Sequence, residues 1–177
     1  MSDSQVVIGI DPGLDGGIAI LGPGKLLACF PMPVTGDKKR TLNRPAVLAL
    51  FDYSSSMASQ VHVFLEKGQA MPKQGGASMY NYGKHCGYLA GLAQGVGFPC
   101  EEIVPRVWQK VMLSSGTGDT KSRSVEKAMQ LFPRVSLLPT PRCRVPSNGM
   151  SDALLIAEFG RRSLSQSHLR LPAAALT

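Results

Sequence analysis

Three carboxylates in this sequence stand where an apolar segment meets a turn or a helix start. Asp11 follows the apolar run 6–10, Glu66 ends an alternating segment, and Asp152 lies at the start of the apolar segment 151–161. In open α/β sheets, functional sites form where strand ends and helix starts meet. If the three side chains converge, their oxygen-only donor set, without Cys or His, favours a hard cation such as Mg²⁺ or Mn²⁺.

Each acid also has a purely structural interpretation. Asp before Pro-Gly is a common turn residue, and Asp15 in the same turn is explained in that way. Glu66 could be a solvated strand end, and Asp152 could favour the helix macrodipole. Independent turn residues need not all fall at one end of a sheet, so their joint placement favours a shared site.

The elements that must position these acids follow from hydrophobic periodicity and from turn residues. The glycine-rich turn "DPGLDGG" predicts an antiparallel hairpin, and an α/β fold with a mixed sheet flanked by helices accounts for the rest. Strands are predicted at 6–10, 17–21, 25–30, 61–66 and 101–104. Residues 31–45 are predicted to be loop. Helices are predicted to start near Asn43–Pro45 (with Val47, Leu48 and Phe51 inward), Ser78, Pro105, Ser124 and Ser151.

Composition limits the classes of function. The 177 residues suit one domain, assigned to 5–162, with 163–177 expected to be a flexible C-terminal tail. No run of 18 apolar residues occurs, which argues against a membrane partner. The four cysteines form no C-x-x-C pair, which favours a reducing compartment. A formal net charge of +7 suggests a polyanionic partner.

Four segments together carry a family resemblance: "GIDPGLDGGIAIL", "FLEKGQAMPKQGGASMYNYGKHCGYLAGL", "VPRVWQK" and "NGMSDALLIAEFGRR". In this order, over roughly residues 5–162, they resemble the RuvC-type Holliday-junction resolvases, and most of all the plant chloroplast (monokaryotic chloroplast) branch. The resemblance implies an RNase H-like fold with a five-stranded mixed sheet of order 3-2-1-4-5. It also implies a chloroplast nucleoid protein whose transit segment is not in this sequence, or else a bacterial or phage-host protein.

The resemblance further implies an activity and its partners. A homodimer would nick two opposed strands of four-way junction DNA symmetrically, leaving 5′-phosphate and 3′-hydroxyl ends that a ligase can seal. Two Mg²⁺ ions per active site, with Mn²⁺ as a substitute, would serve the hydrolysis. No nucleotide cofactor and no membrane are implied.

The family's four metal-binding carboxylates correspond here to Asp11, Glu66, Asn148 and Asp152. Asn148 departs from the pattern, because an Asp is expected and Asn removes one of four negative charges. We therefore expect DNA binding to be kept and cleavage to be impaired. A deliberate Asp→Asn change and a naturally weakened member both explain Asn148, and the near-isosteric swap favours the first. The plain alternative is that Asn148 caps the helix.

Other residues are expected to meet the DNA. Lys121 is predicted to contact the scissile phosphate or stabilise its transition state, with a solvated loop lysine as the alternative. The loop after Glu66 is expected to read the junction, and further basic residues are expected to contact phosphates. The predicted DNA-binding residues are Lys67, Met71, Lys73, Gln74, Lys84, Arg106, Lys110 and Arg123. The stripe Met79, Tyr82, Cys86, Leu89 and Ala93 is predicted to be core or dimer interface, and Trp108 a core anchor.

Three rival interpretations compete with this resemblance. The segment "GTGDTKS" fails as a phosphate-binding P-loop, because Thr120 stands where Gly must precede Lys121. A fragment of an actin-like or sugar-kinase ATPase is disfavoured by the length, which suits one domain where that fold needs two. A non-catalytic junction-binding protein is kept open by Asn148, and the Asn148→Asp change distinguishes it from a disabled nuclease.

Overall fold

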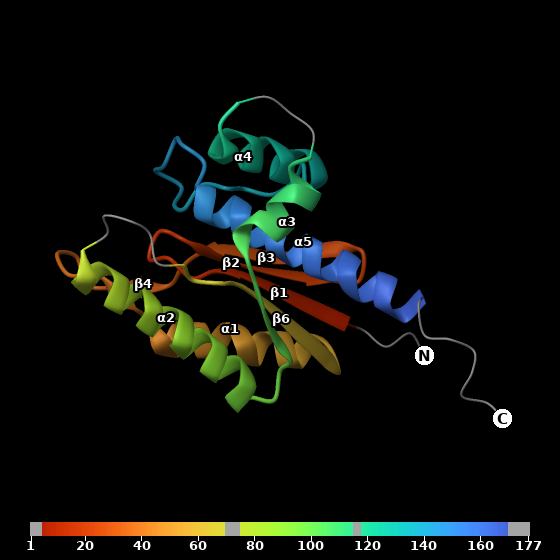
Figure 1. The fold of residues 1–177 in the computed structure, drawn as a ribbon, viewed down its shortest axis with the longest axis horizontal. Coiled ribbons are helices and arrows are strands. Elements are labelled where there is room, and N and C mark those ends of the chain that lie inside the picture. Colours follow the sequence, from red (N-terminus) through yellow and green to blue (C-terminus); the bar gives the residue numbers. More distant parts are fainter. Residues whose placement is uncertain (1–4, 70–74, 115–117, 170–177) are drawn as a thin grey trace.

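The centre of the fold is a mixed five-stranded sheet of order β3-β2-β1-β6-β7 (Figure 1). The computed structural model describes residues 5–69, 75–114 and 118–169. The strands β1 and β2 pair antiparallel, as do β2 and β3, while β1–β6 and β6–β7 are parallel. Counted along this sheet, the order is the predicted 3-2-1-4-5. The strands are β1 (Gln5–Asp11), β2 (Gly17–Gly22), β3 (Lys25–Pro31), β6 (Gln60–Glu66) and β7 (Cys100–Ile103).

Helices cover both faces of this sheet (Figure 1). Side chains of β1 alternate between the faces, with Val6 and Ile8 packing in one cluster and Val7 in the other. One face carries α1 (Arg44–Met57) and α2 (Gly76–Gly95), and the other carries α3 (Pro105–Met112), α4 (Thr120–Leu131) and α5 (Asn148–Leu169).

None of the helices described in the structure is long and apolar enough to cross a membrane.

Three local predictions were wrong. The segment predicted as loop holds a small hairpin, β4 (Val34–Thr35) with β5 (Thr41–Leu42). Leu48, predicted to face inward from α1, is 38% exposed. Residues 163–169 are helical rather than a flexible tail, because no Gly or Pro breaks α5 there and Leu164 packs against the core. The predicted start of α1 near Asn43–Pro45 is confirmed. The Asn43 side chain caps this helix by accepting a hydrogen bond from the Ala46 N–H at 3.2 Å.

Glycines seat α5 directly on the sheet. A Cβ at Gly9 of β1 would overlap backbone atoms of Ala153 and Ala157 in α5. A Cβ at Gly149, in the first turn of α5, would overlap the Asp15 carbonyl oxygen and the Gly16 backbone. Only residues without side chains allow such an approach. The start of α5 is therefore held against the turn between β1 and β2.

Candidate active site

Asp11 and Glu66 end two adjacent parallel strands. Ile10 of β1 pairs with Leu65 of β6, so the next residues along the two strands are neighbours. The carboxyl ends of parallel strands meet at one edge of the sheet. The predicted side-by-side placement of these two acids is therefore confirmed.

The first turns of α5 bring the other two predicted residues to this edge. Ser147 caps the helix, since its Oγ accepts from the Met150 N–H at 3.3 Å and its carbonyl accepts from the Ser151 N–H at 3.1 Å. Asn148 is thus the first helical residue rather than the cap, which removes the plain interpretation of its side chain. One turn later, Asp152 follows on the same side of the helix.

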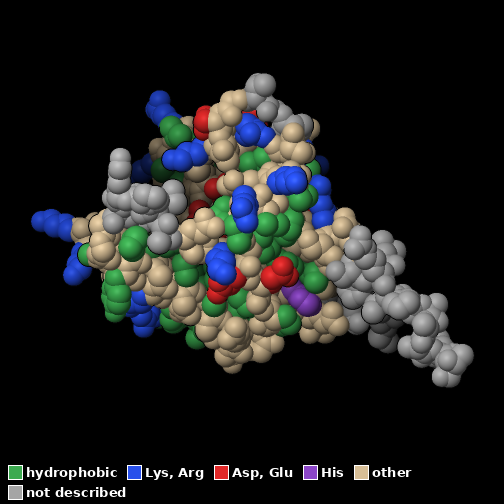
Figure 2. Space-filling model, viewed as in Figure 1, with side chains coloured by type: hydrophobic (Ala, Val, Ile, Leu, Met, Phe, Trp, Pro, Cys, Tyr) green, Lys and Arg blue, Asp and Glu red, His purple; other side chains and the backbone are tan. Residues whose placement is uncertain are grey.

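Most of the predicted site residues line one cavity of about 780 Å³. Asp11, Lys121, Asn148 and Asp152 all contribute to its lining. Glu66 lies outside this lining, yet the charges of Asp11 and Asp152 both act on its carboxylate. Figure 2 shows acidic side chains deep in a hollow of the surface, with Lys and Arg side chains around it.

Burial raises the pKa of each of the three carboxylates, and a neighbouring carboxylate adds to each rise. Burial raises the pKa of Glu66 to about 7; the charge of Asp11 adds to this, a hydrogen bond from Trp108 opposes it, and Asp152 adds a smaller rise. Burial likewise raises the pKa of Asp11, against the Gly13 N–H, which lowers it. Such concentrated negative charge is costly without a cation.

For Asp152, burial raises the pKa to about 6. A hydrogen bond from Ser124 lowers it, the charge of Asp11 raises it, and the ammonium of Lys121 lowers it. Ser124 is fully buried and also contacts Ser151, with 3.1 Å between the two hydroxyl oxygens. Lys121, predicted as a catalytic residue, is therefore close enough to Asp152 to act on its charge.

One oxygen of each carboxylate is fixed by a protein donor. Asp11 Oδ1 accepts from the Gly13 N–H at 3.2 Å, and Glu66 Oε2 accepts from Trp108 Nε1 at 2.8 Å. Asp152 Oδ1 accepts from Ser124 Oγ. Within the described residues, the second oxygen of each carboxylate has no hydrogen-bond donor in the protein. Each acid is thus held in place through one oxygen, and its other oxygen remains available for a cation.

The donor set fits a divalent cation. Three carboxylates and the Asn148 side-chain carbonyl offer only oxygen, which suits Mg²⁺ or Mn²⁺. In the described part of the chain, no group of three or more His, Cys, Asp or Glu side chains already stands close enough to enclose an ion. A bound cation would draw the free carboxylate oxygens together and neutralise their negative charge, which would lower the raised pKa values.

Sequence reasoning missed two parts of this site. Trp108 is fully buried, which confirms it as a core anchor, but its Nε1–H also orients Glu66. The single Trp of the sequence was the only signal of this role. A basic pocket of about 340 Å³ also lies beside the turn between β1 and β2, which we call the site turn. It is lined in part by Lys39, Arg40, Arg44, Lys84 and His85. The basic run 38–40 was its signal in the sequence, which did not show that this run lies near the turn between β1 and β2.

Arg40 connects this basic pocket to the carboxylate site. Its Nη1 pairs with Asp15 Oδ1 at 2.8 Å, and both Arg40 and Leu14 line the two cavities. The site turn between β1 and β2 thus contacts the β4–β5 hairpin through a solvent-exposed ion pair. A polyanion bound at the carboxylate site could therefore extend into the neighbouring basic pocket.

The predicted DNA-binding residues have different settings. Lys67, Lys84, Arg106 and Lys110 are exposed. Arg123 is half-buried, and its Nη2 donates to the Leu113 carbonyl, so part of its guanidinium joins α4 to the end of α3. The remaining three, Met71, Lys73 and Gln74, lie outside the described residues.

Comparison with solved structures places the fold. RuvC of Thermus thermophilus in complex with a Holliday junction substrate matches with a TM-score of 0.62 and 19% identity, covering 92% of this chain and 96% of that chain. Another T. thermophilus RuvC structure matches with a TM-score of 0.53, at the same identity and coverage. No protein-family model and no curated protein sequence matches. The chain therefore has a RuvC-type, RNase H-like fold, as predicted.

Proposed function

We propose that this chain is built as a metal-dependent endonuclease that resolves four-way DNA junctions by paired, symmetric nicks. The observation that carries the proposal is the convergence of Asp11, Glu66 and Asp152, each with a raised pKa and one free oxygen, at one edge of a RuvC-type sheet. The solved RuvC relative, which binds a Holliday junction substrate, and the basic pocket beside the site support DNA as the partner.

The residues of the chain have distinct roles in this proposal. Two Mg²⁺ ions would activate water and stabilise the leaving 3′ oxygen when bound. Asp11, Glu66 and Asp152 would hold them, while Trp108 and Ser124 keep two of these carboxylates oriented. Lys121 would place its ammonium beside the scissile phosphate and stabilise the charge that develops there. The ends produced would be 5′-phosphate and 3′-hydroxyl.

Asn148 lowers the activity of this site and favours a second candidate function. Its neutral amide supplies a carbonyl oxygen but no charge, so one quarter of the negative charge expected at the cations is missing. Binding depends mainly on basic side chains and should survive this loss. A protein that binds junctions without cutting them is therefore the alternative function.

Junction cleavage by the chain and by its Asn148→Asp variant tests the proposal. We expect the variant to nick a synthetic four-way junction in Mg²⁺ at least about a hundredfold faster, because a direct ligand matters at least as much as its supporting groups. The Asn148→Asp, Asp11→Asn double variant is the matched control, and linear duplex of the same sequence is the substrate control. Paired nicks that a ligase seals would support the resolvase.

Two outcomes would contradict it. If both proteins bind the junction and neither cuts it, the nuclease proposal fails and the junction-binding function stands. If the unchanged chain cuts as fast as Asn148→Asp, the charge at position 148 has no role in the site. The chloroplast location stays a prediction of the resemblance.

The proposal also includes a homodimer, with α2 as its interface. Gly83, Gly87 and Gly91 recur every four residues on an exposed face of α2, and apart from adjacent residues and the local helix backbone no described atom lies within 4 Å of an added Cβ. Each glycine costs a helix interior about 1 kcal/mol relative to Ala. Close approach of a second α2 would offset that cost, and packing of such i±4 rows gives a crossing angle of about −50°.

The predicted apolar stripe of α2 is buried only in its second half. Leu89 and Ala93 lie in the core, whereas Met79 of the same stripe is 36% exposed and Tyr80, beside the glycine face, is 71% exposed. Sedimentation should therefore find a dimer that Gly87→Leu dissociates and that Gln130→Leu, an exposed change on α4, leaves intact. A Gly87→Leu protein that stays dimeric would remove α2 from the interface.

A further inference from the structure

A second cavity lies at the opposite end of the sheet from the carboxylates. It measures about 720 Å³ and is formed by the turn between β2 and β3, the end of α4 and the second half of α5. Because β2 runs antiparallel to β1, this turn and Asp11 are at opposite edges. The cavity therefore takes no part in the proposed hydrolysis.

The cavity combines an apolar floor with a basic rim. Leu21 is buried at its base, and Leu26, Leu131, Phe132 and Val135 are half-buried around it. The cations that line it are Lys25, Arg134, Arg161 and Arg162. Among the described residues, Glu158 is the only acid in the lining, and its side chain is 3% exposed. The surface that a visiting molecule meets is thus apolar in the middle and positive at the edge.

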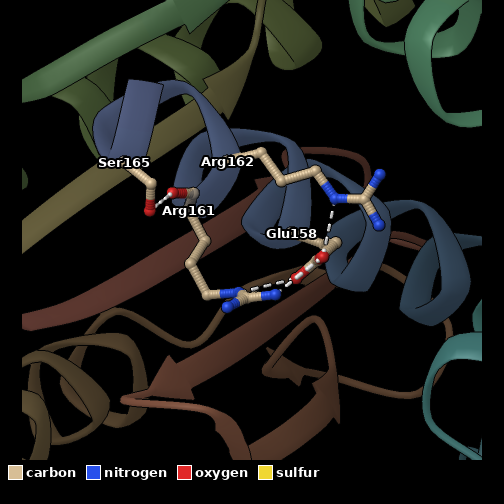
Figure 3. Close-up of polar contacts among 4 residues, drawn as sticks. All are labelled: Glu158, Arg161, Arg162 and Ser165. Carbon is tan, nitrogen blue, oxygen red and sulfur yellow. Dashed lines mark hydrogen bonds and ion pairs between the residues drawn. The ribbon is translucent and has the colours of Figure 1, made fainter. Parts of the chain in front are cut away.

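Glu158 fixes two of these arginines in place (Figure 3). Arg161 grips it with two hydrogen bonds, Nε to Oε2 and Nη2 to Oε1, both 2.8 Å, and Arg162 Nε donates to Oε1 at 2.8 Å. Burial alone would raise the pKa of Glu158, but hydrogen bonds from the two arginines hold that pKa below its ordinary value. The glutamate stays ionised and acts as a positioning residue.

Arg162 retains free donors after this pairing. It binds Glu158 through Nε alone, and within the described residues its two terminal nitrogens have no hydrogen-bond acceptor. Figure 3 shows these nitrogens pointing away from Glu158. Two parallel N–H groups on a fixed guanidinium match the two oxygens of a carboxylate. Lys25 and Arg134 are exposed and add further charge to the same rim.

We infer that this cavity is a docking site for a short acidic segment of a partner protein, with a large apolar side chain on the floor and flanking Asp or Glu residues on the basic rim. Charge complementarity selects the acidic flanks, and the apolar floor selects a peptide over DNA. A phosphate backbone is read by cations and gains nothing from buried Leu and Phe surface. Anchoring by one apolar group in a pocket is a recurring mode of peptide recognition.

Peptide display against the full chain tests this inference. The probe is a library of ten-residue peptides with one Leu or Phe among randomised acidic and neutral positions. We expect selection of peptides with acidic residues on both sides of the apolar one. Their affinity for the Lys25→Glu, Arg134→Glu double variant should fall at least about tenfold, because two rim charges change sign. Lys127→Glu on α4, outside the cavity, is the matched control.

Three outcomes would overturn the inference. These are a selection that enriches no acidic peptide, selected peptides that bind the double variant as well as the unchanged chain, and a double variant that loses affinity for junction DNA instead. The last would make the rim a nucleic-acid contact. Phe132→Ser gives a second, uncharged variant that should also weaken the selected peptides. Junction binding and cleavage are read separately, so failure of this inference leaves the proposed nuclease untouched.

Discussion

Replacing Glu66 by Gln should stabilise the cation-free protein at pH 8 and change its stability much less at pH 5. Burial, with the charge of Asp11, raises the pKa of Glu66 from 4.5 to about 7. An acid with a raised pKa in the folded state stabilises that state below its ordinary pKa, and this contribution is lost as the pH rises through 7. The shift is equivalent to about 3 kcal/mol at pH 8 and about 1 kcal/mol at pH 5.

The isosteric amide removes this penalty and keeps the local structure. The side-chain oxygen of Gln can still accept the hydrogen bond from Trp108 Nε1, which Glu66 accepts at 2.8 Å. Urea unfolding of both proteins at pH 5 and pH 8 in EDTA measures the difference in unfolding free energy. Glu126→Gln, an exposed acid on α4, is the control.

Mg²⁺ should reduce the stability advantage of Glu66→Gln at pH 8. At pH 8 the cation neutralises the ionised carboxylates, so it should stabilise the unchanged chain more than Glu66→Gln. A difference in unfolding free energy that is the same at pH 5 and pH 8, with no effect of Mg²⁺, would refute the reasoning. It would mean that the carboxylates at the strand ends do not repel one another in the folded protein.

Two further changes probe how the site is held. Trp108→Phe removes the hydrogen-bond donor that lowers the pKa of Glu66. In the Asn148→Asp background, the cleavage rate should therefore reach half its maximum at a higher pH, while junction affinity is kept. An unchanged pH–rate profile would argue against this role of Trp108. Gly149→Ala would press a methyl group against the Asp15 carbonyl. Urea unfolding should show a free energy of unfolding that is lower by about 1–3 kcal/mol. An unchanged free energy of unfolding would show that α5 shifts freely.

The edge of the sheet where the acids meet could be predicted from local patterns. Asp11 and Glu66 each end an apolar run, and parallel pairing of those runs was enough to place them together. The i, i+4 spacing of Asn148 and Asp152 placed both on one side of a helix. Such features depend only on strand and helix periods, which the sequence carries within a few residues.

The contacts that orient the acids could not be predicted. Trp108 and Glu66 are 42 residues apart, and Ser124 and Asp152 are 28 apart, so no local period relates either pair. The first depends on how α3 lies against the end of β6, and the second on how α4 packs against α5. The end of α5 was misplaced for another reason, since its polar last turns lack the apolar periodicity by which helices are recognised, although Leu164 still reaches the core.

The seating of α5 on β1 has a consequence for how the protein is synthesised. The strand β1 has its central Gly9 covered by Ala153 and Ala157 of α5, so this contact joins segments that are more than 140 residues apart in the sequence. A nascent chain that stops before residue 148 carries Asp11 and Glu66 but neither Asp152 nor the cover of β1. The proposed hydrolytic site can therefore assemble only after residue 152 has been synthesised, and fragments that end before it would leave DNA intact.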